Sequence, residues 1–424
     1  MYRRLGMHPA RAEFGHNAPE KIKKLFHKML GILITFRLAI ISVIFMYFIC
    51  FLLFPSHVIT SQLELLGVNS IYSSQNDTKV FSFFKESAPK LNKQSLSTIE
   101  KRLNFYFPYD SDCKIENNIW QLWEHRADHK NFPKQCFPFM EQWRLSNTES
   151  NHNLITIKEA EAQIFNYFSV DMPEIVEAYQ SLPDIRLKFE FLKYLLIYTS
   201  GGVYADIDTL NIIPVKHWYE SSLKPSRLMV GVNIDYNDVS WDVLYNRRLS
   251  FSTKVFRAKA HHPFFAKLIA RIVYSIFNSQ NEIKSINWDK AFQNVDSNGE
   301  PLIQFISESI FTDTLFSYFN ALKDPVVHRV ARTEKDLLPE QIYGPETNEM
   351  FSYKLFTLAK GPTQVDDVVV MPQRTFRGPS NSVHKGVNNK DSIDKEILAL
   401  QKESYFYVKS YNFLDLDLLV NEGS

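Results

Sequence analysis

The chain has 424 residues, of which 45% are hydrophobic and 14% aromatic. These values are typical of a folded globular protein and exclude a disordered or low-complexity chain. The length suits one large domain with additional segments. A formal net charge of only +1 argues against a nucleic-acid-binding protein, and three cysteines exclude a small disulfide-stabilised scaffold.

The low net charge conceals a basic N-terminal segment. Residues 1–37 carry eight basic and two acidic side chains, and residues 38–54 carry none of either. Because about 20 apolar residues span a bilayer as a helix, we predict a cytosolic basic tail at 1–28 and a transmembrane signal anchor at 29–54. Basic flanks stay cytosolic, so the remainder is expected to be lumenal, as in a single-pass type II membrane protein. A cleaved signal peptide and a buried core helix are the alternatives.

The segment after the anchor is rich in Ser, Lys, Asn and Gln. We predict a partly helical stem at 55–112 and a lumenal domain at 113–424. The stem contains an Asn-x-Ser/Thr sequon at Asn76, which is a candidate glycosylation site. Cys113 and Cys136 are the cysteines expected in the oxidising lumen, so we predict a disulfide between them, with two free buried thiols as the alternative.

Strand-like and helix-like patterns alternate through the domain, which predicts an α/β sheet flanked by helices. In chain order we expect a strand at 117–123, helices at 157–168, 171–182 and 186–200, strands at 203–213 and 228–233, helices at 262–278 and 301–320, and a strand at 367–371. Gly201 and Gly202 follow the third of these helices and suit a glycine C-terminal cap.

Two acidic residues alternate with apolar residues in the strand expected at 203–213. Asp206 and Asp208 are two positions apart, so they would share one face of the strand at a spacing of about 7 Å. Carboxylates held together favour a cation between them, and their oxygens suit Mg²⁺ or Mn²⁺. Such a cation can neutralise a departing diphosphate. The alternatives are a solvated strand face and the paired carboxylates of a glycosidase, which usually come from separate strands or loops.

The segment GGVYADIDT and the helix before it resemble the metal-binding segment of sugar transferases that carry the DXD motif. The resemblance is specifically to the fungal Och1-type α-1,6-mannosyltransferases of glycosyltransferase family 32. Further segments are similar to that family in the same order: NNIWQLWEHR at 117–126, YNRRLSFSTKVFRAKAHHPFF at 245–265, SESIFTDTLFSYFN at 307–320 and DVVVMPQRTF at 367–376. Together they cover roughly residues 115–380.

The resemblance implies a GT-A fold, a GDP-mannose donor and a divalent cation, usually Mn²⁺ and otherwise Mg²⁺. It implies that Asp206 and Asp208 bind the metal and the diphosphate, and that Asp206 also contacts the donor. Asp313 is the implied residue of the reaction face. The remaining donor-binding residues that it implies are Trp120, Gln121, Glu190, Lys193 and Tyr204.

The chain departs from the family's pattern in three places. Glu190 and Lys193 stand where the family usually has Asp and Arg, and Glu308-Ser309 replaces a Gly-Pro. Lys offers a point charge in place of the planar fork of Arg. The family's late His and Gly-Ser-Trp are absent from residues 405–417.

The sequence therefore predicts a mannosyltransferase of the Golgi, or endoplasmic reticulum, membrane. It would move mannose from GDP-mannose to a glycan of an N-glycan outer chain or mannan, with an α-1,6 linkage and retention of configuration. Other mannosyltransferase subunits are candidate partners. The alternatives are a mannosyltransferase acting on an inositol-phosphate sphingolipid and a non-catalytic subunit of a mannan-polymerising complex. The presence of Asp206 and Asp208 argues against the non-catalytic alternative.

Overall fold

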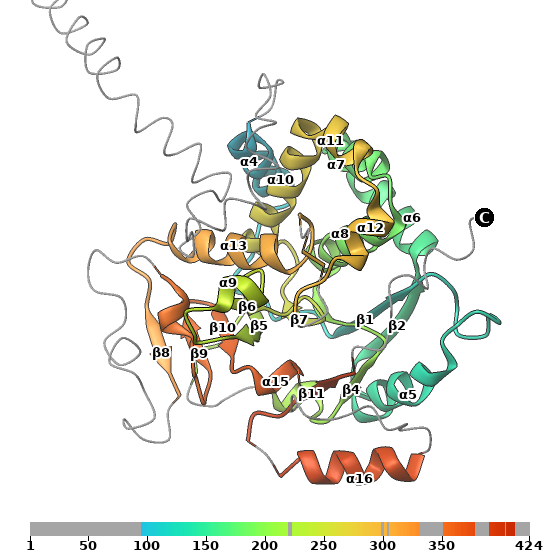
Figure 1. The fold of residues 1–424 in the computed structure, drawn as a ribbon, viewed down its shortest axis with the longest axis vertical. Coiled ribbons are helices and arrows are strands. Elements are labelled where there is room, and N and C mark those ends of the chain that lie inside the picture. The colour runs from blue at the N-terminus through green and yellow to red at the C-terminus, as the bar shows by residue number, and fades with distance from the viewer. Residues whose placement is uncertain are drawn as a thin grey trace, which may run out of the picture. The chain divides into compact units, whose positions relative to one another are not determined.

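The computed structural model describes residues 95–218, 223–297, 301–302, 305–330, 351–377, 390–402 and 404–411 (Figure 1). The predicted basic tail, signal anchor and sequon at Asn76 lie outside these residues, as does most of the predicted stem. Among the helices in the described part of the chain, none is long and apolar enough to cross a membrane.

A nine-stranded mixed sheet forms the centre of the domain (Figure 1). Its spatial order is β2-β1-β3-β7-β5-β10-β9-β8, and β6 pairs with β5. The strands are β1 (Asn118–Trp123), β2 (Asn151–Thr156), β3 (Gly202–Ala205), β5 (Leu228–Asp235), β6 (Leu249–Phe251), β7 (Val255–Ala258), β8 (Val327–Arg329), β9 (Thr363–Val365) and β10 (Val368–Met371). Strands β1, β2, β3, β5 and β10 run parallel, whereas β7 and β9 run against them. A separate two-stranded sheet pairs β4 (Thr209–Asn211) with β11 (Val408–Ser410).

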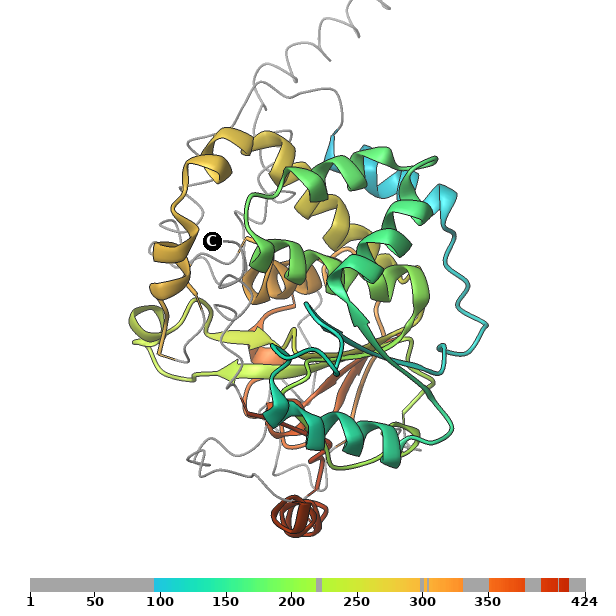
Figure 2. The same cartoon turned by 90° about the vertical axis from the view of Figure 1, so that its right-hand side faces the viewer.

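Helices cover both faces of the sheet (Figures 1 and 2). On one face lie α4 (Leu96–Tyr106), α6 (Ile157–Phe168), α7 (Pro173–Ser181), α8 (Ile185–Ser200), α10 (Pro263–Asn278), α11 (Gln280–Ser285), α12 (Trp288–Gln293) and α13 (Glu308–Phe319). On the other face lie α5 (Phe137–Ser146), α15 (Arg374–Arg377) and α16 (Lys390–Leu400). The short helix α9 (Trp241–Leu244) follows β5. The predicted α/β class is therefore confirmed.

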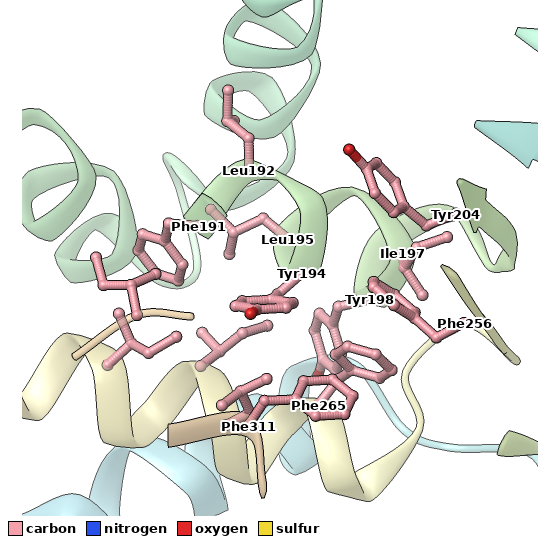
Figure 3. Close-up of a cluster of buried hydrophobic side chains, with 14 of the residues drawn as sticks. Phe191, Leu192, Tyr194, Leu195, Ile197, Tyr198, Tyr204, Phe256, Phe265 and Phe311 are labelled. Carbon is pink, nitrogen blue, oxygen red and sulfur yellow. The ribbon is translucent and has the colours of Figure 1, made fainter. Parts of the chain in front are cut away.

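The main core lies between the sheet and α8, which is apolar around most of its circumference. Tyr194 of α8 has its ring centroid 6.3 Å from that of Phe256, 6.3 Å from that of Phe265 and 5.8 Å from that of Phe311, so one aromatic cluster joins α8 to β7, α10 and α13 (Figure 3). Tyr204 of β3 packs on the same cluster, and its hydroxyl points away from it (Figure 3). The cluster therefore fixes α8 relative to the end of β3.

Gly201 and Gly202 carry the chain from α8 directly into β3. Their φ angles are +57° and +104°, which L side chains rarely adopt. A Cβ added at Gly202 would lie 2.4 Å from the carbonyl oxygen of Asn118, at the start of β1. The glycine-requiring helix end predicted from the sequence is confirmed, and it lets β3 pair closely with β1.

The strand predicted at 203–213 is broken at the acidic motif. Strand β3 ends at Ala205, residues 206–208 form a turn, and the chain resumes as β4. The turn is closed by the backbone N–H and hydroxyl of Thr209, which donate to the carbonyl oxygen of Asp206 at 3.2 and 2.5 Å. The expectation that Asp206 and Asp208 alternate along one strand face is therefore wrong.

Two further expectations about the domain's N-terminal part are wrong. The predicted stem extends too far, because α4 lies within it and buries Leu96, Ile99 and Leu103 in the main core. The predicted disulfide is not formed, and both cysteines are free. Exposed Cys113 donates a hydrogen bond to Asp110, whereas Cys136 is buried in the core.

Candidate active site

The carboxyl ends of the parallel strands β1, β3, β5 and β10 meet at one edge of the sheet. In open α/β sheets this edge is the usual place for a ligand. Asp206 follows β3 there, and its backbone N–H donates to the carbonyl oxygen of Lys254, just before β7, at 2.9 Å. Asn233 lies near the end of β5, and Gln373 follows β10. Polar side chains from three segments therefore gather at this edge.

Asp206 is held in place by a tyrosine of β3, the strand that precedes it. The hydroxyl of Tyr204 donates to Oδ1 of Asp206 at 2.8 Å. Burial raises the pKa of Tyr204 well above its ordinary value, and the nearby carboxylate of Asp206 adds to that rise. The hydroxyl therefore stays protonated and remains a donor. Tyr204, predicted to bind the donor, is fully buried and acts on the carboxylate.

A buried lysine sits between two carboxylates. Nζ of Lys193 lies 2.7 Å from Oε1 of Glu190 and 3.6 Å from Oδ1 of Asp206. Burial alone would lower the pKa of Lys193, but the charges of Asp206 and Glu190 outweigh it and the pKa is raised. The lysine is therefore a fixed cation beside Asp206. The structure brings together Glu190, Lys193 and Asp206, three residues that the resemblance implies to contact the donor.

Asp208 is almost completely buried, at 2% exposure. Its backbone carbonyl accepts a hydrogen bond from the N–H of Tyr411 at 3.2 Å, directly after β11. Strand β11 in turn pairs with β4 from Thr209 to Asn211. The C-terminal strand thus supports the turn that carries both aspartates, although its sequence lacks the family's His and Gly-Ser-Trp.

Gln121 and Trp120, two of the predicted donor-binding residues, occupy different places. The amide of Gln121 donates to the carbonyl oxygen of Asp206 at 3.4 Å, and its own carbonyl bonds to His152 at 2.8 Å. The indole of Trp120 instead donates to the carbonyl oxygen of Gly201 at 2.9 Å. Gly201 precedes β3, whereas Asp206 follows it, so the structure does not bring Trp120 to the acidic turn.

Asp313 does not face the site, contrary to its predicted place on the reaction face. Both of its carboxylate oxygens accept from the guanidinium of Arg247, at 3.0 and 2.8 Å, and both side chains are 1% exposed. Arg271 lies close enough for the charge of Asp313 to act on it. The arrangement is a buried ion pair that ties α13 to the segment before β6.

Sequence reasoning did not assign a role to Glu308, the first residue of α13. Its carboxylate accepts from Asn233 at 2.6 Å and from Ser250 at 3.1 Å, and the residue is 3% exposed. Gln373 and Arg377 then donate to the backbone carbonyl of Asn233 at 2.8 and 2.9 Å. The sequence feature that could have indicated this role is the acidic residue Glu308, which takes the place of the glycine in the family's Gly-Pro.

The acidic turn has the chemistry of a divalent cation site. Within the residues described, no group of three or more His, Cys, Asp or Glu side chains is placed to hold a metal ion. Mg²⁺ and similar cations, however, are commonly held by one or two carboxylates together with substrate phosphates. Asp206 and Asp208 supply two such carboxylates two positions apart, so the donor set fits a cation that also binds a diphosphate.

Comparisons with known proteins match the segment that carries the acidic turn. The family model for the glycosyltransferase sugar-binding region containing the DXD motif matches residues 61–224, which include both aspartates. The "Initiation-specific alpha-1,6-mannosyltransferase" of Candida albicans is 29% identical, over 70% of this chain and 73% of the relative. The "Putative glycosyltransferase HOC1" of Saccharomyces cerevisiae is 30% identical, over 73% of this chain and 70% of the relative.

A second protein from Saccharomyces cerevisiae, also called "Initiation-specific alpha-1,6-mannosyltransferase", is 24% identical over 69% of this chain and 78% of its own length. Among solved structures, the PaToxG glycosyltransferase matches with a TM-score of 0.29 and 13% identity, over 57% of this chain and 78% of that one. The chain is therefore a glycosyltransferase and belongs to the DXD-containing family that includes the fungal initiation-specific α-1,6-mannosyltransferases.

Proposed function

We propose that this glycosyltransferase has a GT-A fold and transfers mannose from GDP-mannose to a glycan hydroxyl, forming an α-1,6 linkage with retention of configuration. The observation that carries the proposal is the turn of Asp206 and Asp208 at the carboxyl edge of the sheet, fixed by Tyr204 and Lys193. The names of the relatives in Candida albicans and Saccharomyces cerevisiae support mannose as the sugar and the α-1,6 linkage.

We further propose that Asp206 and Asp208 hold Mn²⁺ or Mg²⁺ together with the donor diphosphate. A bound cation of this kind would neutralise the charge that develops on the departing nucleotide. Lys193 keeps its positive charge next to Asp206, which holds that carboxylate in position. The protein's contribution is then positioning and electrostatic stabilisation rather than covalent catalysis.

The proposed reaction breaks the bond between C1 of mannose and the diphosphate oxygen and forms a bond from C1 to the acceptor oxygen. The acceptor's proton passes to the departing phosphate. Asp313 is engaged by Arg247 and cannot serve as the base without breaking that buried pair. The chain is thus proposed to act by holding donor and acceptor at the carboxyl edge.

A donor panel tests the proposal. The purified chain would be incubated with Mn²⁺, an α-mannoside acceptor and, separately, GDP-mannose, UDP-glucose and UDP-N-acetylglucosamine. Of the three donors, we expect only GDP-mannose to give nucleotide release that depends on the acceptor. Linkage analysis should show a 1,6-linked product. Preferred use of another donor, or a different linkage, would contradict the proposed specificity.

The membrane placement is a separate proposal. We propose that residues 29–54 anchor the chain in the Golgi or endoplasmic reticulum membrane with the domain in the lumen. The charge asymmetry of residues 1–37 supports it. In intact vesicles a tag before Met1 should be open to protease and a tag after Ser424 protected, and the reverse pattern would contradict this topology.

A further inference from the structure

Strand β5 contains a bulge at its carboxyl end. The register of β5 with β6 shifts between Val232 and Ile234, which makes Asn233 the extra residue. In a regular strand Asn233 would share a face with Met229, which packs in the core on the side of α5 and α15. Its side chain instead reaches Glu308 of α13, on the face that α8 covers (Figure 1). Bulges redirect a side chain in this way and are frequent next to active sites.

The carboxylate of Glu308 fixes the orientation of the Asn233 amide. Nδ2 of Asn233 donates to Oε1 of Glu308 at 2.6 Å, and the hydroxyl of Ser250 donates to Oε2 at 3.1 Å. A carboxylate accepts hydrogen bonds, so the NH₂ end of the amide must face it. Oδ1 of Asn233 is therefore turned away from Glu308, and no described residue donates to it. The residue is 7% exposed, and Oδ1 is an acceptor that a ligand can use.

The backbone of Asn233 is fixed as well. The side chains of Gln373 and Arg377 donate to its carbonyl oxygen at 2.8 and 2.9 Å. A bulge disrupts the hydrogen bonds between strands locally, and these two donors satisfy the carbonyl at that point. The side chain and the backbone are thus both held before any ligand binds, as a specific contact requires.

Asn233 and the acidic turn lie at the same edge of the sheet. Only β7 separates β3 from β5, so the ends of these two strands are two strand spacings, or roughly 10 Å, apart. Tyr194 of α8 lies near both places (Figure 3). Burial raises its pKa well above the ordinary value, and the charges of Glu190, Glu308 and Asp206 add to that rise. The carboxylate that holds Asn233 and those of the acidic site therefore act on one buried hydroxyl.

We propose that Oδ1 of Asn233 accepts a hydrogen bond from a hydroxyl of the transferred sugar, and that Glu308 is the positioning residue for this contact. The inference rests on the proposed function, because it takes the donor diphosphate to lie at Asp206. The attached sugar then occupies the gap between the ends of β3 and β5, which is of the size of one hexose ring. A sugar without this hydroxyl would leave Oδ1 unpaired, so the contact contributes to donor specificity.

Donors that each lack one sugar hydroxyl test the contact. The full chain is assayed with Mn²⁺, an α-mannoside acceptor and GDP-mannose or its 2-, 3-, 4- or 6-deoxy form. We expect one deoxy form to lower kcat/KM of the wild type at least tenfold. Asn233→Ala should lose at least tenfold with GDP-mannose, and should use that deoxy form no less well than GDP-mannose. If each missing hydroxyl costs Asn233→Ala as much as it costs the wild type, the contact is overturned.

Asn320→Ala is the matched control. Asn320 follows the other end of α13, and its side chain bonds to the N–H and the carbonyl oxygen of Phe351 at 2.6 and 3.2 Å. Its removal should leave the preference among the donors as it is in the wild type. If Asn320→Ala changes that preference in the same way as Asn233→Ala, discrimination depends on the placement of α13 and the contact is overturned.

Glu308→Gln tests the positioning role. Glutamine can donate as well as accept, so the amide of Asn233 can turn over and present its NH₂ end to the sugar. We expect a several-fold lower kcat/KM with GDP-mannose and weaker discrimination against the critical deoxy form. A purely structural role would lower the melting temperature and leave the discrimination unchanged, and that result would overturn the positioning role.

Affinity for GDP separates this inference from the proposed function. GDP carries the diphosphate without the sugar, so calorimetric titration with Mn²⁺ should give equal affinities for the wild type, Asn233→Ala and Glu308→Gln. If the wild type uses a different nucleotide sugar, the proposed donor fails, and deoxy forms of that sugar replace the mannose series. Loss of GDP affinity in Asn233→Ala would show that the change disturbs the acidic turn and would overturn the assignment.

Discussion

The carboxylate of Asp206 is positioned by two side chains that would not contact solvent or substrate themselves. Tyr204 donates to it, and Lys193 provides a fixed charge. Both are almost fully buried, so their geometry is set by the core around α8. The consequence is that a change at Tyr204 should alter the acidic turn without touching the ligand.

We therefore expect Tyr204→Phe to lower kcat/KM about tenfold, because a hydrogen bond to a charged group contributes on the order of 1.5–3 kcal/mol. Tyr198→Phe is the matched control, since its hydroxyl bonds only weakly, at 3.4 Å, to the carbonyl oxygen of Leu103. Donor-dependent nucleotide release measures both variants. Equal losses in the two, or none in Tyr204→Phe, would contradict the positioning role.

His152 gives the fold a defined dependence on pH. Burial lowers its folded pKa to about 4, and the usual unfolded value is about 6.5. The unfolded chain therefore binds the proton first, and stability present above pH 6.5 is lost as the pH falls towards 4. The full shift corresponds to at most about 3 kcal/mol.

The variant His152→Gln removes this titration and keeps a donor for Gln121. Urea unfolding measures the free energy of unfolding at pH 7 and at pH 4.5. Between these pH values the wild type should lose about 2 kcal/mol more of it than the variant does. A wild type and a variant that lose the same stability between these pH values would show that His152 is already charged or exposed.

At the scale of elements, α13 is joined to the sheet by a buried ion pair. Asp313 is bonded through both oxygens to Arg247, with Arg271 nearby. Removing one partner of such a pair leaves uncompensated buried charge and typically costs about 3–5 kcal/mol. The pair therefore has a structural role that accounts for Asp313 without catalysis.

Asp313→Asn should lower the free energy of unfolding by about 3–5 kcal/mol. Asp289→Asn is the control, because Asp289 also pairs with a buried arginine, Arg186, but is itself 70% exposed. That change should cost no more than about 1 kcal/mol. Denaturant unfolding compares them. If the Asp313→Asn protein has normal stability but no sugar transfer, the structural role is contradicted and Asp313 acts in the reaction.

Local sequence patterns predicted the long elements well. The helices α6, α7, α8 and α10 begin and end within two residues of their expected bounds, because their apolar side chains recur with helical spacing and are buried in the core. The break between β3 and β4 could not be predicted in this way. The alternation of apolar and polar residues continues through Asp206 and Asp208, as in an unbroken strand. The turn is instead fixed by the pairing of β4 with β11, which lies far away in the chain.

In the candidate site, too, the residues that lie close together in the sequence could be predicted, and those brought in by distant packing could not. Asp206 and Asp208 lie in one local motif. Glu190 and Lys193 lie three positions apart on the preceding helix, and the resemblance to the DXD-containing transferases predicted their place in the site. Glu308 reaches the carboxyl edge only through the packing of α13, and no local pattern indicates that.

At the scale of the whole molecule, the folded domain begins earlier in the chain than the polar composition of residues 95–112 suggests. Residues 95–112 are polar enough to resemble a stem, yet α4 packs on α10 and buries three aliphatic side chains. Phe107, directly after α4, is also buried in the main core. Each large apolar side chain buried in this way stabilises the fold by roughly 1.5–3 kcal/mol.

A fragment of residues 95–424 should therefore melt cooperatively and remain soluble, whereas a fragment of residues 113–424 should melt at a markedly lower temperature or aggregate. Thermal melts and soluble yields of the two fragments, expressed side by side, provide the comparison. Identical melting temperatures would show that α4 adds nothing to the domain and would restore the stem boundary at 112.

The central claim is that the charge of the acidic turn holds a cation needed for sugar transfer. The most direct measurement is GDP release from GDP-mannose against Mn²⁺ concentration for the wild type, Asp208→Asn and the exposed control Asp324→Asn, each with a thermal melt. We predict that Asp208→Asn folds but loses transfer at every Mn²⁺ concentration, because Asn keeps the volume and removes the charge. Asp324→Asn should match the wild type, and EDTA should stop both. Full activity of Asp208→Asn, or wild-type activity that EDTA does not reduce, would contradict the account.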